Sequence, residues 1–260
     1  MTIQQSELTL KKLEMNTTDL RSLLDLQDKI IAGFKPDEQH FILHRTIDDF
    51  SNALKSNHMY VFGLYDGERL VSQSILSLPN DDTTREIPEY AAEYKNSELA
   101  VFKAVLVDPE YRGRGLMKQM LRIREEVAAQ HGRKIAITQI AADNPASWVN
   151  AIQYGMRITK VGYDPEDNAK VIYLQKHLDN KKIQPLEEKK AYRLSLGSDV
   201  HKNVPALFNK MMSLSESGMI GTTWDKQNNQ IIWYPQSKTH HHTRLPKFNI
   251  STSSKTIHQI

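Results

Sequence analysis

The feature that most constrains the fold is a short glycine-rich segment between two apolar elements. Residues 99–107 form a nearly unbroken apolar run, which predicts a buried strand. Residues 116–131 carry apolar side chains at helical spacing, which predicts an amphipathic helix of about four turns. The residues between them include Gly113 and Gly115. The sequence therefore predicts a strand, a tight turn and a helix N-terminus in direct succession.

A turn of this kind favours a bound anion. The first N–H groups of a helix have no partner within the helix, and the helix dipole places positive potential there. Gly113 and Gly115 let an anion approach the backbone closely, and Arg112 and Arg114 add charge suited to phosphate. We expect a pyrophosphate group at this turn, against the alternative of a glycine-rich connection with no ligand.

Two common phosphate-binding motifs do not match the turn. A P-loop needs Lys-Ser or Lys-Thr after its last glycine, but Gly115 is followed by Leu116 and Met117. A dinucleotide-binding fingerprint needs a third glycine at the position of Lys118. The sequence therefore excludes both motifs here.

The spacing Arg112-x-x-Gly115 resembles the Arg/Gln-x-x-Gly-x-Gly/Ala signature of the GNAT acetyltransferase superfamily, which binds acetyl-coenzyme A (acetyl-CoA). Asp108 and Tyr111, just before the arginine, are also similar to that family. The chain departs from the signature at the last position, where Met117 replaces Gly or Ala. We expect the Met117 side chain either to narrow the phosphate site or to point into the core.

The predicted order of elements supports the same resemblance. Apolar patterns predict a strand, two helices, three strands, a helix, a strand, a helix and two strands over about residues 5–178. The clearest pair is a hairpin of residues 59–65 and 69–78 around a turn at residues 66–67. The resemblance implies an α/β fold with a mixed sheet of the GNAT type, followed by a small basic C-terminal extension.

The resemblance also implies a set of acetyl-CoA contacts. The implied contacts are the backbone of Val105, Leu106 and Val107 for the pantetheine arm, and Arg112, Gly113, Arg114, Gly115, Leu116 and Met117 for the pyrophosphate. Asn144, with Gly155 following as in a second family signature, would hydrogen-bond the pantetheine arm, assisted by Ser147. Asn144 suits a plain helix N-cap equally well.

The residues for proton transfer are less well defined. The family often uses a tyrosine seven residues after the asparagine as general acid, and this chain has Ala151 there. Tyr154 and Tyr173 are alternative acids, although packing is the stronger interpretation for both. Glu98 is the candidate base because some relatives use a glutamate in this region, but spacing from the turn puts Leu99 on that site.

The charge pattern divides the chain near residue 180. Residues 181–260 carry 12 Lys and Arg against 5 Asp and Glu, whereas residues 1–180 carry 22 against 26. We expect a GNAT-like domain over 1–180, a small extension over 181–235 and a disordered tail over 236–260. A chain ending near residue 180 should then still fold and bind acetyl-CoA. Within the extension, apolar patterns predict a strand, a helix and a hairpin at residues 191–196, 204–212, 219–224 and 230–234.

The basic C-terminal part allows several interpretations. Residues 181–260 could contact nucleic acid or an anionic membrane, although a solvated segment is the stronger interpretation. His240, His241 and His242 could bind a metal, but adjacent residues in a tail rarely close a site, so we expect no metal.

Composition excludes several classes of protein. The chain has no cysteine, which excludes disulfides, thiolate metal sites and a cysteine nucleophile, and fits a reducing compartment. It has no apolar run long enough to cross a bilayer and no signal-peptide core near its start, so we expect a cytoplasmic protein. One long polar loop, residues 80–97, carries several acids, which favour a cationic acceptor. These acids are Asp81, Asp82, Glu86, Glu89 and Glu93.

The expected activity is transfer of the acetyl group of acetyl-CoA to a primary amine on a small molecule or peptide, by direct attack in a ternary complex. Met117 and Ala151 motivate one alternative, a non-catalytic acyl-CoA-binding module. The other alternative is an interaction protein that acts through its basic C-terminal part.

Overall fold

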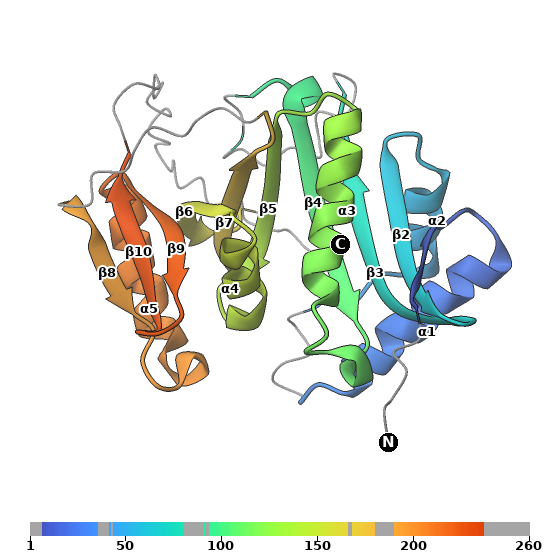
Figure 1. Ribbon diagram of the computed structural model, residues 1–260, viewed down its shortest axis with the longest axis horizontal. Coiled ribbons are helices and arrows are strands. Elements are labelled where there is room, and N and C mark those ends of the chain that lie inside the picture. Colours follow the sequence, from blue (N-terminus) through green and yellow to red (C-terminus); the bar gives the residue numbers. More distant parts are fainter. Residues whose placement is uncertain are drawn as a thin grey trace, which may run out of the picture.

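The computed structural model describes residues 7–35, 42, 44–80, 91, 94–165, 168–179 and 190–236. These residues form one mixed sheet of ten strands with helices packed on it (Figure 1). The strand order across the sheet is β1-β2-β3-β4-β5-β7-β6-β9-β10-β8. The strands are β1 (Thr9–Lys12), β2 (Met59–Asp66), β3 (Arg69–Ser77), β4 (Leu99–Val107), β5 (Ile135–Ala141), β6 (Arg157–Tyr163), β7 (Lys170–His177), β8 (Tyr192–Ser195), β9 (Met219–Asp225) and β10 (Gln230–Pro235).

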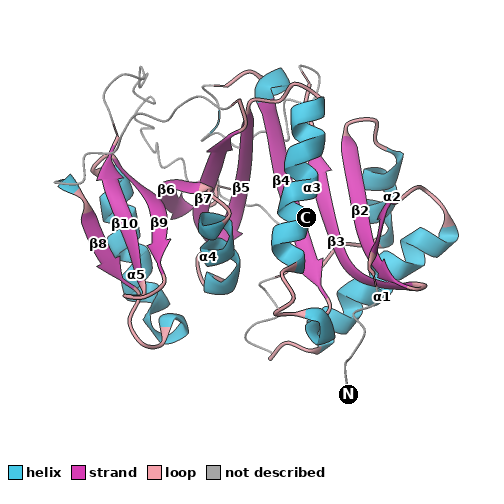
Figure 2. Cartoon of the chain, in the orientation of Figure 1, coloured by secondary structure: helices cyan, strands magenta, loops and turns pink. Residues whose placement is uncertain are grey.

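The described residues also form five α-helices, which Figure 2 distinguishes from the strands by colour. They are α1 (Thr17–Ala32), α2 (Ile47–Lys55), α3 (Leu116–Gln130), α4 (Pro145–Gln153) and α5 (Val200–Glu216), with short 3-10 helices η4 (Asn96–Glu98) and η5 (Pro109–Tyr111). The predicted order of elements up to β7 is confirmed, and so is the mixed α/β fold class.

Two separate cores lie on opposite faces of strands β2 to β4. On one face α1 and α2 pack over a cluster that includes Phe50, Ile75 and Leu106. On the other face α3 packs over the main core, which includes Phe102 and Met120. Successive strand residues point to opposite faces, so one strand feeds both cores. In Figure 1, α3 lies in front of β3 and β4, and α2 lies behind β2.

Strands β4 and β5 part from each other along their length. They pair in parallel only where residues 99–101 face residues 135–137. Thr138 of β5 then donates from Oγ1 to the carbonyl oxygen of Phe102 at 2.8 Å. Beyond this bond β4 continues with β3, and β5 continues with β7 (Figure 1). An opening between β4 and β5 therefore begins beside Phe102 and extends toward the end of β4.

A β-bulge in β4 lies where this opening begins. Lys103 and Ala104 together oppose the single residue Ile75 of β3. A bulge of this kind bends the strand and turns a backbone group out of the ladder. β4 therefore changes direction at the point where it leaves β5.

The hairpin of β2 and β3 is confirmed, but its turn lies one residue later than predicted. Asp66 still pairs with Arg69, so the loop consists of Gly67 and Glu68. Gly67 has a φ of 59°, and the first position of a two-residue hairpin loop favours a glycine for this reason. The predicted turn at Asp66-Gly67 is wrong by this one residue.

Residues 190–236 continue the same sheet. β9 joins β6 through the pairing of Ile158 with Gly221, and β10 and β8 follow. A Cβ atom at Gly221 would lie 3.2 Å from side-chain atoms of Ile158 and Trp233, so any larger residue there would require these neighbours to shift. Phe208 of α5 and Trp233 of β10 are fully buried in the main core. Neither the sheet nor the core is interrupted after residue 180.

None of the helices within the described ranges is long and apolar enough to cross a membrane. The predicted tail lies, after Gln236, outside the described residues. So do the acids at positions 81, 82, 86, 89 and 93.

Candidate active site

The glycine turn, residues 112–115, connects η5 to α3 directly below the end of β4. Gly113 and Gly115 have φ angles of 75° and 77°, in the left-handed region that disfavours other residues. A Cβ atom added to either glycine would meet no heavy atom within 4 Å. The backbone conformation therefore calls for glycine here, and the space beside the turn is open.

The N-terminus of α3 lacks the side-chain cap that the other α-helices of the described chain possess. Asn16, Thr46, Asn144 and Asp199 each accept a hydrogen bond from the first turn of their own helix. Gly115 is the N-cap of α3 and makes no such bond, and the first turn of α3 carries no acid. Its N–H groups therefore stand at the positive end of the helix dipole without a side-chain acceptor. Such a terminus binds phosphate oxygens well.

Both arginines of the glycine turn lie over aromatic rings. The Cζ atom of Arg114 is 4.6 Å from the ring centroid of Tyr111, and that of Arg112 is 5.7 Å from the ring centroid of Phe34. Cation–π contacts of this kind restrict where a guanidinium lies. Both side chains are exposed, so their charges remain accessible next to the open side of the turn.

The first two residues of α3 contact the core. Leu116 is buried, and Met117 is partly buried and packs against the main core. Of the two expectations for Met117, the structure therefore shows the contact with the core.

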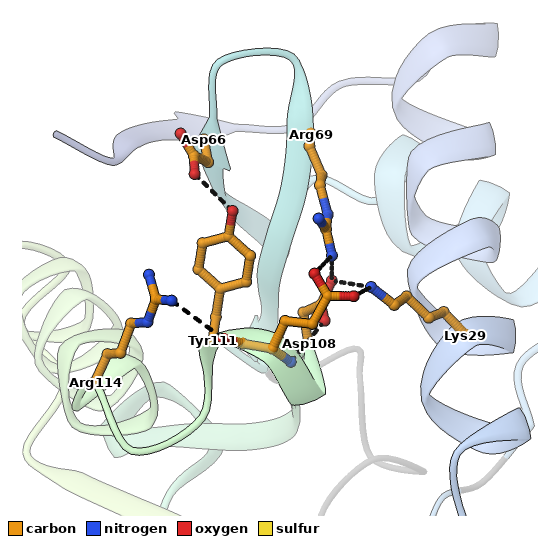
Figure 3. Close-up of polar contacts among 7 residues, drawn as sticks. Lys29, Asp66, Arg69, Asp108, Tyr111 and Arg114 are labelled. Carbon is orange, nitrogen blue, oxygen red and sulfur yellow. Dashed lines mark hydrogen bonds and ion pairs between the residues drawn. The ribbon is translucent and has the colours of Figure 1, made fainter. Parts of the chain in front are cut away.

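An ion-pair cluster holds the segment before the glycine turn (Figure 3). The cluster consists of Lys29 of α1, Arg69 of β3, and Asp108 and Glu110 at η5. Lys29 Nζ lies 2.9 Å from Asp108 and 2.7 Å from Glu110, and Arg69 Nη2 lies 2.6 Å and 2.8 Å from the same two carboxylates. Each cation thus bridges both acids. The cluster ties the turn to a helix and a strand that lie far away in the sequence.

The Asp108 side chain is only 1% exposed, so its charge must be compensated within the protein. Burial acts to raise the pKa of Asp108, but hydrogen bonds from Lys29 and Arg69 outweigh it and hold this pKa below its ordinary value. The same two cations lower the pKa of the exposed Glu110. Asp108 therefore remains ionised at neutral pH.

Tyr111 adds a second tie from η5 to the β2–β3 hairpin. Its hydroxyl donates a hydrogen bond to Asp66 Oδ2 at 2.6 Å, and this bond raises the pKa of Tyr111 (Figure 3). The segment that leads into the glycine turn is consequently tied to the hairpin as well as to α1.

The strand that leads to the turn has one open edge. Val105, Leu106 and Val107 pair with β3 on one side, and no described strand pairs with them on the side toward β5. Backbone groups on this edge lack ladder partners, and an extended ligand with amide groups could supply them. The pantetheine contacts that the family resemblance implies for these three residues stay a prediction for this edge.

Arg124 of α3 lies beside the bulge in β4, and sequence reasoning missed it. The side chain is 1% exposed, and Nη1 donates to the carbonyl oxygens of Lys103 at 3.0 Å and Ile75 at 3.4 Å. Its Cζ atom is 4.5 Å from the Phe102 ring centroid, and its Nε has no partner in the described part of the chain. Burial lowers the pKa of Arg124 to about 9, so the guanidinium stays charged at neutral pH.

Asn144 is the N-cap of α4. Its Oδ1 accepts a hydrogen bond from the backbone N–H of Ser147 at 3.2 Å, which gives Asn144 the capping role. This bond uses only the oxygen, so the Nδ2 donors can still contact a carbonyl of a ligand. Ser147 lies in the first turn of α4 and is partly exposed.

The position of the expected general acid is filled by a buried methyl group. Ala151 is 1% exposed in the main core. Tyr154 lies at the end of the same helix, with Lys176 Nζ 4.2 Å from its ring centroid. Burial, and then a hydrogen bond to Glu125, raise the pKa of Tyr154 well above its ordinary value. A phenol with a raised pKa is a weak proton donor near neutral pH.

The other two candidates lie apart from the glycine turn. Tyr173 is 3% exposed in β7, and its hydroxyl lies 3.5 Å from the carbonyl oxygen of Tyr163. Glu98 precedes β4, at the end opposite to the turn, and pairs with Lys134 Nζ at 2.7 Å. Hydrogen bonds from Lys134 and the Lys95 backbone lower the pKa of Glu98, which makes it a weaker base.

The described residues contain no group of three or more His, Cys, Asp or Glu side chains that could hold a metal ion. His240, His241 and His242 lie outside the described part of the chain.

Comparison with solved structures shows the same architecture in other proteins. An N-acetyltransferase from Staphylococcus aureus Mu50 is 16% identical, with a TM-score of 0.51 over 67% of this chain and 99% of that one. The Salmonella typhimurium protein yncA, solved with its cofactor acetyl-CoA, is 13% identical, with a TM-score of 0.51 over 69% of this chain and 99% of that one. The GNAT domain of S. lividans PAT is 13% identical, with a TM-score of 0.50 over 65% and 90% of the two chains. At these identities the likeness shows the fold alone.

Comparison at the level of sequence gives the family. No curated protein sequence matches this chain. The family model for the acetyltransferase (GNAT) family matches residues 22–149, which include the C-terminal part of α1, the opening between β4 and β5, and the glycine turn. The chain therefore contains a domain of the GNAT acetyltransferase family.

Proposed function

We propose that the protein is an N-acetyltransferase that uses acetyl-CoA and acts on a primary amine. The observation that carries this proposal is the uncapped N-terminus of α3 behind the left-handed Gly113 and Gly115, at the end of a strand with one open edge. Pyrophosphate would bind at the glycine turn, and the pantetheine arm would lie along residues 105–107. Asn144 would contact the same arm from the β5 side of the opening.

The proposed reaction needs no covalent enzyme intermediate. The amine nitrogen attacks the thioester carbonyl carbon, the C–N bond forms, and the C–S bond breaks. The acetylated amine loses one proton, and coenzyme A leaves as thiolate or thiol. A thiol is the stronger acid, with a pKa near 8.5 against about 10.4 for an alkylamine, so the sulfur can depart without a strong proton donor. A missing tyrosine at Ala151 is compatible with this chemistry.

The cofactor site can be tested with a matched pair of variants. Gly115→Glu should abolish acetyl-CoA binding, because a carboxylate would stand in the open space beside the pyrophosphate. Gly132→Glu is the control, since Gly132 also has a positive φ, 68°, and open surroundings, but follows the other end of α3. Both variants carry similar backbone strain, about 1–2 kcal/mol. Calorimetric affinity that is equal in the two variants would contradict the proposed site.

In a thiol assay of turnover, the protein itself gives no background signal. Because the chain has no cysteine, a thiol reagent reports only the coenzyme A released. Release that depends on an added amine, with the acetylated amine detected by mass spectrometry, would establish the enzyme. Acetyl-CoA binding without release for any amine would favour the second candidate, an acyl-CoA-binding module, which the buried Ala151 motivates.

Tyr154 should not be essential for turnover. Tyr154→Phe is expected to retain turnover within about tenfold, because loss of a general acid typically costs a hundredfold or more. Tyr173→Phe serves as the parallel variant and should behave in the same way. A hundredfold loss in either, at unchanged acetyl-CoA affinity, would identify that tyrosine as the acid.

A further inference from the structure

A cavity of about 360 Å³ lies between α2 and the sheet, on the face that α3 does not cover. Its lining includes Arg45, which precedes α2, Asp49 and Asn52 of α2, Ile75 of β3 and Lys103 of β4. Nothing in the proposed cofactor site uses this space. Helix α3 covers the opposite face of the sheet, and the glycine turn follows the C-terminal end of β4.

The cavity reaches the point where the transferred acetyl group would lie. Between pyrophosphate and sulfur, the pantetheine arm contains about as many chain atoms as four residues. An arm that starts at the glycine turn and follows β4 from Val107 therefore ends near Lys103. Lys103 and Ile75 face each other at the bulge, and both line the cavity. An acceptor in the cavity would approach the thioester from the face opposite to α3.

The charged groups of the cavity lining are mostly cationic. Arg45 and Lys103 face a single carboxylate, Asp49. That carboxylate accepts hydrogen bonds from the backbone N–H and the hydroxyl of Thr46 at the N-terminus of α2, which lower its pKa. Asp49 is therefore already committed to the helix cap. A bound anion would be attracted to the Arg45 guanidinium in the same lining.

Arg45 is held in place by a buried side chain of α1. The amide of Gln27, which is fully buried, bonds both the N–H and the carbonyl oxygen of Arg45, each at 2.9 Å. Burial lowers the pKa of the Arg45 guanidinium, with Asp49 acting in the opposite direction. No carboxylate within the described ranges lies at ion-pair distance from this guanidinium. A partly buried guanidinium on an anchored backbone is well suited to bind a carboxylate or phosphate.

We propose that this cavity holds the acceptor, and that the acceptor is a small primary amine that also carries a carboxylate or a phosphate, which pairs with Arg45. The inference rests on the proposed N-acetyltransferase function. The positive surroundings also lower the pKa of a bound amine and so favour its neutral, nucleophilic form. This acceptor class differs from the cationic acceptor that the acids of residues 81–93 suggested, and those acids lie outside the described residues.

The experiment compares kcat/KM for matched amines with the full-length protein. The amines are 1-aminopentane, 1,5-diaminopentane, 5-aminopentanoate and 3-aminopropyl phosphate. We expect an anion-bearing amine to be preferred over 1-aminopentane by about tenfold to a hundredfold, the value of a hydrogen-bonded charge pair. The better of the two anionic substrates identifies the anion. Direct calorimetric binding of both anionic amines gives a readout that does not depend on turnover.

Variants at Arg45 then test the assigned partner. In Arg45→Gln the ratio of kcat/KM for the anionic amine to that for 1-aminopentane should fall by about tenfold or more. Arg45→Lys should retain most of the ratio, and Arg21→Gln, an exposed arginine of α1, should retain all of it. Thermal melts show whether each variant is folded.

Two outcomes overturn the inference while leaving the proposed function intact. One is a wild-type protein that prefers 1,5-diaminopentane, or that uses 1-aminopentane as well as both anionic amines, and the other is a ratio that Arg45→Gln leaves unchanged. Failure of the proposed function looks different, because acetyl-CoA would then neither bind nor release coenzyme A with any amine. The inference falls with it in that case.

Discussion

Two fully buried glutamines differ in what their amide groups contact. Gln27 of α1 bonds the backbone of Arg45 through both its oxygen and its nitrogen. Gln73 of β3 is equally buried, but neither amide atom has a partner within the described chain. A buried polar group without a hydrogen bond costs about 1–3 kcal/mol. The unpaired amide of Gln73 therefore lowers the free energy of unfolding relative to an apolar side chain of the same volume at this position.

Gln73→Leu should stabilise the protein, because a side chain of similar volume replaces the unpaired amide. We expect a gain of about 1–2 kcal/mol in the free energy of unfolding. Gln27→Leu is the matched control and should destabilise, since it removes both hydrogen bonds to Arg45. Denaturant unfolding measures both changes. A Gln73→Leu variant less stable than wild type would show that the amide has a bound water or ligand as its partner.

Arg124 is a second buried polar residue, and it acts on the shape of β4. Its guanidinium bonds the carbonyl oxygens on the two sides of the bulge, from Lys103 and Ile75. The bulge sets the direction in which residues 105–107 present their open edge. We therefore expect Arg124 to be a positioning residue for the cofactor strand rather than a group that touches substrate.

Arg124→Met should lower kcat/KM for acetyl-CoA by about tenfold to a hundredfold, the usual effect of a small misplacement of reacting groups. Arg124→Lys should restore part of the loss, because it can still donate to one carbonyl. Arg122→Met changes an exposed arginine on the same helix and should have no effect. Equal kinetics for Arg122→Met and Arg124→Met would contradict the positioning role.

At the scale of elements, the ion-pair cluster is the main tertiary tie of the glycine turn. Lys29 and Arg69 reach η5 from a helix and a strand that precede it by about 80 and 40 residues in the sequence. Contacts between such distant segments form only when the sheet and α1 have packed. The conformation of the turn is therefore coupled to the fold of the N-terminal half.

The cluster predicts a dependence on acid pH. Hydrogen bonds from Lys29 and Arg69 hold the pKa of Asp108 below its ordinary value of 3.8. The stabilisation is thus complete above that ordinary value and is lost as pH falls through the lower pKa of the folded state. Asp108→Asn should destabilise by about 1–2 kcal/mol at pH 7, with the exposure of the two cations taken into account.

Thermal melts between pH 7 and pH 3 test this prediction. The melting temperatures of wild type and Asp108→Asn should begin to approach each other as pH falls below 3.8, because Asp108 of the unfolded wild-type chain then becomes protonated first. Glu68→Gln, an exposed position on the nearby hairpin, controls for a general loss of charge. A constant difference between wild type and Asp108→Asn at every pH would show that ionisation of Asp108 is not the cause.

Local signals predicted the elements well, because they depend on neighbouring residues. The Asn16 and Thr46 caps mark the starts of α1 and α2, and the glycine turn marks the start of α3. The apolar pattern predicts the start of α5 at Val204, but Asp199 caps the helix earlier and the helix continues through Pro205. Proline is costly inside a helix, so the local signal there pointed away from the observed structure.

Features that depend on distant contacts could not be predicted in the same way. Arg124 stands among charged residues of an amphipathic helix, and only the packed bulge shows that it is buried. The cavity between α2 and the sheet is lined by both Arg45 and Lys103, which come from different parts of the chain. For the candidate site, the sequence therefore predicted the glycine turn, and the family resemblance implied contacts along residues 105–107, but neither indicated Arg124 or this cavity.

At the scale of the whole molecule, the C-terminal strands share their core with the family domain. Phe208 and Trp233 are buried in the cluster that contains Ile158 and residues of α3. The backbone N–H of Val161 in β6 also donates to Ser215 Oγ of α5 at 3.3 Å. Removing residues 181–260 would expose this packed surface to water.

Truncation tests how far the two parts depend on each other. A chain ending at residue 180 retains the glycine turn and Asn144, yet we expect it to aggregate or to melt at a lower temperature than wild type. A chain ending at residue 236 retains every described element and should melt like the full chain. A soluble 1–180 fragment that acetyl-CoA stabilises would instead support the independent domain expected from the charge pattern.

The junction between the two parts also has a mechanical consequence. β5 and β7 are joined by seven consecutive pairs, whereas β6 and β9 are joined by the one pair of Ile158 and Gly221. A force that separates the two parts would therefore act on one residue pair instead of seven. Helix α5 contacts both β6 and β9 and so also connects them. The junction of β6 and β9 therefore has fewer paired residues than any other pair of neighbouring strands in the described sheet. We expect the sheet to bend more readily at this junction than between β5 and β7.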